Sequence, residues 1–279
     1  EQLLLSPQPV VAMTFALPGN DTVLSGVLPD SVKVDLCRLG LFPEAIGYIG
    51  HSEILDVRVG HIVPRVESDG VLRETPAFVC FDGQAYPALS LQAFLHASGL
   101  GQSIVVSDGN QAELVIDDAL RIPLTAQGGI RIPYHLESPS FERVSASDVL
   151  AGIVELDGRW AVVGSSAVGL SDRISTPLVP LETGALAHVR LLGAMLDQKF
   201  PVATLGGQVM IWVATALLLG GLLILSLLRQ LRWWIAPLVV AISGSLLFGI
   251  AGLFQVNHFL FVGLVGPLTG LVSGGVAAT

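Results

Sequence analysis

The last part of the chain is almost uninterrupted apolar sequence. Residues 209–228, 235–256 and 259–278 form three runs of 20, 22 and 20 residues without a charged side chain. A helix of about 20 apolar residues is long enough to cross the hydrocarbon core of a bilayer. The pattern therefore predicts three transmembrane helices, in a membrane region that covers residues 201–279 and has the lipid bilayer as its partner.

The few charges in this region predict its orientation. Arg229 and Arg232 are the two charged side chains of residues 201–279, and both follow the first apolar run. Loops that carry Arg and Lys face the cytoplasm. Residues 1–200 are therefore expected outside the cytoplasm, in a multi-pass protein of the cell (inner) membrane.

The third run carries small residues at helical spacing. Gly266, Gly270 and Gly274 lie four residues apart, which places them on one face of a helix. Such a face lets a second helix approach closely, within the bundle or across a homodimer. The alternative is that glycine is simply frequent in membrane helices.

In residues 1–200, short β-rich runs alternate with helical ones, which predicts one α/β domain with a mixed sheet. The expected strands are residues 10–17, 45–54, 59–66, 71–81, 104–106, 113–116, 130–134 and 160–163. Residues 59–66 and 71–81 are expected to form a hairpin around Ser68-Asp69-Gly70. The expected helices are residues 31–41, residues 88–97, a short helix capped by Ser145 or Ser147, and residues 183–200, with Leu186, Val189, Leu192 and Leu196 on one side.

Composition narrows the class of protein. Of the residues, 52% are hydrophobic and 13% are charged, whereas a soluble domain has about 25% charged residues. An ordinary cytosolic globule and a disordered chain are thus excluded. The net charge of −9, with no basic run, argues against nucleic acid as a partner.

The two cysteines, Cys37 and Cys80, are expected as buried free thiols, since both have apolar neighbours. An extracytoplasmic location would also allow them to oxidise. No Cys or His pattern has the spacing of a metal site, so no metal and no cofactor are expected in this chain.

Two motifs stand out in residues 1–200. The first has the pattern DG-x-x-R-x-x-P, precedes a YPALSL stretch, and comprises Asp69, Gly70, Arg73 and Pro76. The second is a strand ending in VG, then a loop with Asp and Thr-Pro, then G-x-x-x-H on a helix; it comprises Val163, Gly164, Asp172, Thr176, Pro177, Gly184 and His188.

With the three runs that follow them, these motifs resemble the second class of CHASE domains, the cyclase- and histidine-kinase-associated sensory extracellular domains of bacteria. Val189 stands where that family often has alanine. The resemblance implies a dimeric receptor that relays an extracytoplasmic signal to a cyclase, a two-component kinase or a cyclic-dinucleotide enzyme. It also implies that an N-terminal part of the domain precedes Glu1 and that the output domain follows Thr279.

Four residues are the predicted contacts of an unknown ligand: Arg73, Ser165, Ser166 and Asp172. The three loop residues follow a strand end, where α/β sheets often border a binding crevice; the alternative is a loop packed on the helix that carries His188. Arg73 either binds an anionic group or, as we expect, forms a structural pair with a carboxylate such as that of Asp172.

The remaining motif residues have structural explanations. Asp69-Gly70 is typical of a turn, Gly164 permits a sharp turn at the strand end, and His188 is expected as a satisfied core histidine.

A membrane-anchored extracytoplasmic serine hydrolase is the alternative function. Residues 164–169 (GSSAVG) resemble the G-x-S-x-G nucleophile elbow, but the second glycine comes one residue late. Asp172 follows Ser166 by six residues, too few to reach another strand end. We therefore expect no catalytic residue in this chain. The predicted spans carry no ionisable residue at mid-depth, which disfavours transport.

Overall fold

The computed structural model of the chain describes residues 9–32, 35–52, 57–108, 112–134, 141–156, 158–165 and 173–201. The chain divides into two compact units, Glu1–Phe200 and Pro201–Thr279, and the described residues fall in the first unit apart from Pro201. No helix within these ranges has the length and hydrophobicity that a membrane crossing requires. The three predicted spans, with Gly266, Gly270 and Gly274, lie outside the described residues.

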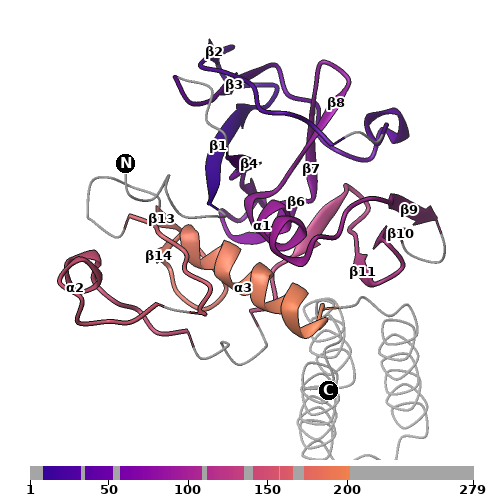
Figure 1. Cartoon of the computed structure of the whole chain (residues 1–279). Helices are drawn as coiled ribbons and strands as arrows, with labels where there is room; N and C mark the ends of the chain where they lie inside the picture. The colour runs from indigo at the N-terminus through magenta and orange to yellow at the C-terminus, as the bar shows by residue number, and fades with distance from the viewer. Residues whose placement is uncertain are drawn as a thin grey trace, which may run out of the picture. The chain divides into compact units, whose positions relative to one another are not determined.

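One sheet has the strand order β2-β3-β1-β4 (Figure 1). Its central strand β1 pairs in parallel with β4 and antiparallel with β3. This arrangement confirms the predicted mixed sheet in an α/β domain. The strands are β1 (Val10–Ala16), β2 (Leu24–Ser25), β3 (Gly47–Ile49) and β4 (Arg58–His61).

The other described strands form antiparallel groups, ordered β12-β6-β5, β11-β10-β9, β7-β8 and β13-β14. Their bounds are β5 (Arg65–Val66), β6 (Leu72–Pro76), β7 (Phe78–Phe81), β8 (Gln84–Pro87), β9 (Ile104–Asp108), β10 (Ala112–Ile116), β11 (Leu120–Pro123), β12 (Gly129–Arg131), β13 (Arg173–Ile174) and β14 (Glu182–Thr183). The helices are α1 (Leu89–Ser98), α2 (Ala146–Leu150) and α3 (Ala185–Asp197), with a 3₁₀ turn η2 (Cys37–Leu39).

The β7–β8 hairpin separates two hydrophobic cores. Its two-residue turn is Asp82-Gly83, and both residues have positive φ, 50° and 72°, as the favoured hairpin turns require. Successive strand residues point to opposite faces. Phe78 therefore faces the larger core, which α1, α3 and β9–β12 share, while Val79 faces a smaller core with Phe15 of β1.

Helix α1 packs against β1 and β4 and also against α3. Gly60 of β4 makes this approach possible, because a Cβ at that position would lie 2.5 Å from the Cα of Leu89. Leu91 and Leu95 of α1 are buried in the larger core. Helix α1 thus connects the mixed sheet to α3, the last described helix before residue 201.

Several expected elements are confirmed. Ser145 is the N-cap of α2, and its hydroxyl accepts a hydrogen bond from the N–H of Ser147 at 3.2 Å. The predicted hairpin turn at 68–70 joins β5 and β6, although β4 pairs with β1 instead. The other confirmed predictions are the strands at 10–17, 104–106 and 113–116 and the helix at 88–97, whereas the strand predicted at 130–134 ends at Arg131.

The helix predicted over residues 31–41 is wrong; the described part contains only the 3₁₀ turn η2. Val32 donates its N–H to the carbonyl of Ala85 at 3.0 Å, which fixes this segment against β8. Gly40, with a φ of 63°, then ends η2. Contacts distant in sequence override the local helical pattern here.

The buried strand predicted at 160–163 is also wrong. Trp160 is 47% exposed and Val163 is 72% exposed. No strand among the described residues pairs with this segment. Its backbone groups therefore make no strand hydrogen bonds, and a buried position would leave them without partners.

The apolar face predicted for the last helix is only partly correct. Leu186 and Leu192 are buried, but Leu196 is 47% exposed and Val189 is only half-buried. The buried side of α3 also includes two polar residues, His188 and Arg190. Both α1 and β14 pack against the helix.

The expectation of free thiols is wrong as well, because Cys37 and Cys80 form a disulfide with a Cα–Cα distance of 5.8 Å. Two backbone contacts hold their segments together. Val32 bonds to Ala85 of β8, and the N–H of Ala45 donates to the carbonyl of Cys80 at 2.7 Å. The fold therefore brings the two thiols close enough to form a bond. Because they are 43 positions apart in the chain, the local sequence around each cysteine does not predict this pairing.

Candidate functional site

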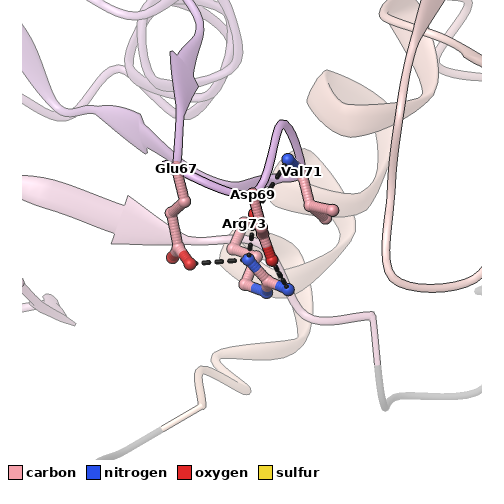
Figure 2. Close-up of polar contacts among 4 residues, drawn as sticks. All are labelled: Glu67, Asp69, Val71 and Arg73. Atoms are coloured by element: carbon pink, nitrogen blue, oxygen red, sulfur yellow. Dashed lines mark hydrogen bonds and ion pairs between the residues drawn. The ribbon is translucent and has the colours of Figure 1, made fainter.

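The first motif forms a closed turn between β5 and β6 (Figure 2). Gly70 adopts a φ of 80°, and its N–H donates to the carbonyl of Glu67 at 2.9 Å. The carboxylate of Asp69 accepts a hydrogen bond from the N–H of Val71 at 3.0 Å. This turn confirms the sequence interpretation of Asp69-Gly70.

Arg73 lies against two carboxylates of the same turn (Figure 2). Its Nη1 is 2.6 Å from Oε2 of Glu67, and its Nη2 is 2.7 Å from Oδ2 of Asp69. The hydrogen bond from Arg73, then that from Val71, lowers the pKa of Asp69, and the bond to Asp69 raises the pKa of Arg73. Two carboxylates against one guanidinium leave a net charge of −1, which disfavours an anion at this point.

The pairing expected for Arg73 therefore exists, with Glu67 and Asp69 as the partners. Asp172, the partner named from the sequence, lies outside the described residues. Ligand binding by Arg73 stays a prediction.

Hydrogen bonds connect this turn to the second motif. The N–H of Leu72 donates to the carbonyl of Ser175 at 2.8 Å. The hydroxyl of Thr176 accepts from the N–H of Val179 at 3.1 Å and donates to its carbonyl at 3.0 Å. The Thr176-Pro177 pair thus forms a tight turn before β14, which leads directly into α3. Both motifs therefore support the start of that helix.

A buried ion pair links β14 to α3. Oε1 of Glu182 lies 3.5 Å from Nη2 of Arg190, and both side chains are almost fully buried. The guanidinium carbon of Arg190 lies 5.5 Å from the centre of the Tyr134 ring, at cation–π distance. Burial, then the charge of Glu182, raises the pKa of Tyr134, so its hydroxyl stays neutral. Sequence reasoning missed this cluster, since no local pattern relates residues 134, 182 and 190.

Two buried histidines, one of them on α3, interact electrostatically. His188 of α3 is 8% exposed, and His61 at the end of β4 is 0% exposed. Burial lowers the pKa of His188 to about 4. Burial, then the charge of His188, lowers the pKa of His61 to about 3. Both rings are therefore neutral at pH 7.

His188 lies in the core, where the sequence analysis expected it, but its Nδ1 has no hydrogen-bond partner within the described part of the chain. His61 was missed. Its Nδ1 accepts a hydrogen bond from the N–H of Val63 at 3.2 Å, while its Nε2 has no partner among the described residues. The sequence analysis predicted a strand over residues 59–66 and assigned no side of it to His61.

The loop predicted to contact a ligand is described only in part. A Cβ at Gly164 would lie 2.5 Å from the Cβ of Ala185, the first residue of α3. Close approach to α3 thus explains this glycine. Ser165 is exposed, and Ser166 and Asp172 lie outside the described residues, so their ligand contacts stay a prediction. In the described ranges no group of three or more His, Cys, Asp or Glu side chains could hold a metal ion.

We expect Asp69→Asn to loosen the first turn while leaving the domain folded. The amide oxygen can still accept from Val71, but the charge-assisted bonds to Arg73 are lost, and these are roughly twice as strong as neutral ones. Amide hydrogen exchange in residues 67–73 should rise by about tenfold or less, with an unchanged thermal midpoint. Asp35→Asn, at the exposed pair with Arg38, is the control; equal exchange in both variants would contradict this role.

The comparisons with known proteins agree with these motifs. A family model described as CHASE2 domain matches residues 9–228, which is 220 of the 279 residues. The matched range contains both motifs, α3 and the first predicted span. No curated protein and no solved structure matches the chain.

Proposed function

The chain belongs to the family of CHASE2 domains, the extracellular sensory domains of signalling receptors, and from that premise we propose that it is the sensor and transmembrane-transducer portion of a bacterial receptor. In this proposal the domain up to Phe200 senses an extracytoplasmic ligand or partner. Residues 201–279 relay the change through the membrane to a cytoplasmic cyclase, kinase or cyclic-dinucleotide enzyme, within a homodimer.

The position of α3 is the observation that carries this proposal. Leu191 and Met195 of α3 are fully buried, and its first turn contacts the loop at Gly164. The helix ends at Asp197, four residues before the second unit begins at Pro201. A ligand that favours one of two packings of α3 would shift the population of that packing. The change would then reach residue 201 through a very short connection.

The Cys37–Cys80 disulfide supports the proposed extracytoplasmic location. Disulfides form and persist in oxidising compartments such as the bacterial periplasm and are rare in the cytosol. The disulfide is independent of the orientation predicted from Arg229 and Arg232 in the sequence analysis. Both observations favour residues 1–200 outside the cytoplasm.

The relay can be tested with two matched leucine substitutions. Leu191 of α3 and Leu114 of β10 are both fully buried in the larger core, and Leu→Ala costs about 2–5 kcal/mol at such sites. With residues 1–279 placed before a reporter cyclase in bacterial membranes, Leu191→Ala should change cyclase output by about tenfold. Leu114→Ala should change it much less.

Protein levels in the membrane are measured alongside, so that output is compared per folded molecule. Equal outputs from wild type and Leu191→Ala, or equal changes in the two variants, would reject α3 as the relay.

A further inference from the structure

Two histidines from different elements are buried in the core, one of them on α3, and they interact electrostatically. His61 ends β4, which packs against α1, and α1 packs in turn against α3, which carries His188. The two rings are near enough for the charge of one to act on the other. Nε2 of His61 and Nδ1 of His188 have no hydrogen-bond partner in the described residues. A proton on either of these nitrogens would be buried, and for His61 the backbone carbonyl of Pro76 offsets the cost of burial only in part.

The carboxylates of the surrounding elements each pair with an arginine, although Oε2 of Glu182 has no hydrogen-bond partner among the described residues. On β14, Glu182 pairs with Arg190 of α3 at 3.5 Å. On β6, Glu74 pairs with Arg65 of β5 at 3.2 Å. These two arginines compete with a protonated histidine for the negative charge.

The remaining elements around the pair supply no carboxylate. Helix α1 has one titratable side chain, His96, and β1 has none. Strand β4 adds the exposed Arg58, β8 adds the phenol of Tyr86, and the phenol of Tyr134 faces Arg190. These elements therefore add no negative charge beside His61 or His188, and the backbone carbonyl of Pro76 outweighs neither the burial of His61 nor the charge of His188.

We propose that protons are an input to this sensor: protonation of His188 and His61 releases α3 from the core, so that acidification outside the cell moves the helix that precedes residue 201. This inference rests on the proposed function, because it takes α3 as the relay. It adds the chemical class of the signal.

The direction of the effect follows from burial. An imidazole in water has a pKa near 6.5, whereas the docked rings have pKa values of about 4 for His188 and about 3 for His61. The state in which α3 is packed in the core is thus favoured above pH 6.5. Its stability relative to the released state falls as the pH drops below 6.5. The equilibrium constant for release of α3 should rise about tenfold per pH unit because His188 takes up a proton. It should rise about another tenfold per unit where His61 also becomes hydrated and takes up a proton.

Amide hydrogen exchange of the full chain in lipid nanodiscs tests this prediction between pH 7.5 and pH 4.5. Rates are corrected for the intrinsic pH dependence of exchange. The opening constant of α3 amides should rise at least tenfold per pH unit below 6.5, while the amides of β10 and β11 keep their protection. An α3 opening constant that is independent of pH would overturn the proposal, and so would equal opening of α3 and β10, which indicates global unfolding.

Glutamine substitutions identify the groups that titrate. In His188→Gln, the opening constant of α3 should rise about tenfold less per pH unit than in the wild type. The variants are compared by this pH slope and not by their absolute protection. If His188→Gln leaves α3 unprotected at all pH values, His61→Gln provides the same comparison from β4. His96→Gln, the same change on α1, should keep the wild-type slope. A wild-type slope in both His188→Gln and His61→Gln would overturn the proposal.

The reporter cyclase separates this inference from the proposed function. Output that responds to Leu191→Ala but not to external acid would retain α3 as the relay and reject protons as the input. Acid-dependent opening of α3 with an unchanged output in Leu191→Ala would retain the proton linkage and reject the relay.

Discussion

Replacing both Cys37 and Cys80 by alanine should lower the free energy of unfolding by about 4 kcal/mol. The disulfide joins residues separated by 43 positions, and closing a loop of that length restricts the unfolded chain. A loss of this size is a large share of the roughly 5–15 kcal/mol that stabilises a typical domain. Urea unfolding followed by tryptophan fluorescence, at neutral pH, measures the change.

Wild-type protein unfolded in the presence of a reducing agent provides the control for the disulfide. Its unfolding midpoint should approach that of the double variant, since the same bond is absent in both. A double variant that unfolds at the same urea concentration as the oxidised wild type would show that this link does not stabilise the domain.

Arg190→Met should lower the free energy of unfolding by about 3–5 kcal/mol. The substitution leaves the carboxylate of Glu182 buried at 7% exposure without its guanidinium partner. It also removes the contact between the guanidinium and the Tyr134 ring. The double variant Glu182→Gln with Arg190→Met should recover much of this loss, because no unpaired charge remains.

A double-mutant cycle in urea, with Glu182→Gln as the second single variant, measures the coupling. Arg38→Met removes an arginine from an exposed pair with Asp35, whose side chains are 88% and 52% exposed. It should change stability by less than about 1 kcal/mol. Strict additivity of the Glu182 and Arg190 substitutions would contradict a coupled buried pair.

Both predictions concern groups that local patterns did not identify. The residues around Cys37 have a helical pattern, and those around Cys80 a strand pattern, so each thiol was placed correctly in an apolar setting but not beside the other. Residues 71–81 were interpreted as one strand, although Asp82-Gly83 is a typical hairpin turn. The structure divides that stretch into β6 and β7, and β7 then pairs with β8. Local pattern indicates that a segment is extended, but not which strand it joins.

The sequence by itself determined the features that depend on near neighbours. The turn at Asp69-Gly70, the cap at Ser145 and the helix α1 each form from residues a few positions apart. The local sequence is therefore sufficient to predict them. The two motifs were also sufficient to indicate the family, because their order and spacing are properties of the chain itself.

Only the tertiary structure decided what surrounds α3. The interaction of His61 with His188, like the stacking of Arg190 on Tyr134, joins residues more than 50 positions apart. The burial that shifts a pKa depends on every element packed around the ring, and so does the pairing of a buried charge. Helical periodicity placed Leu196 on the buried face and gave no reason to bury Arg190, because periodicity describes one helix and not the partners that cover it.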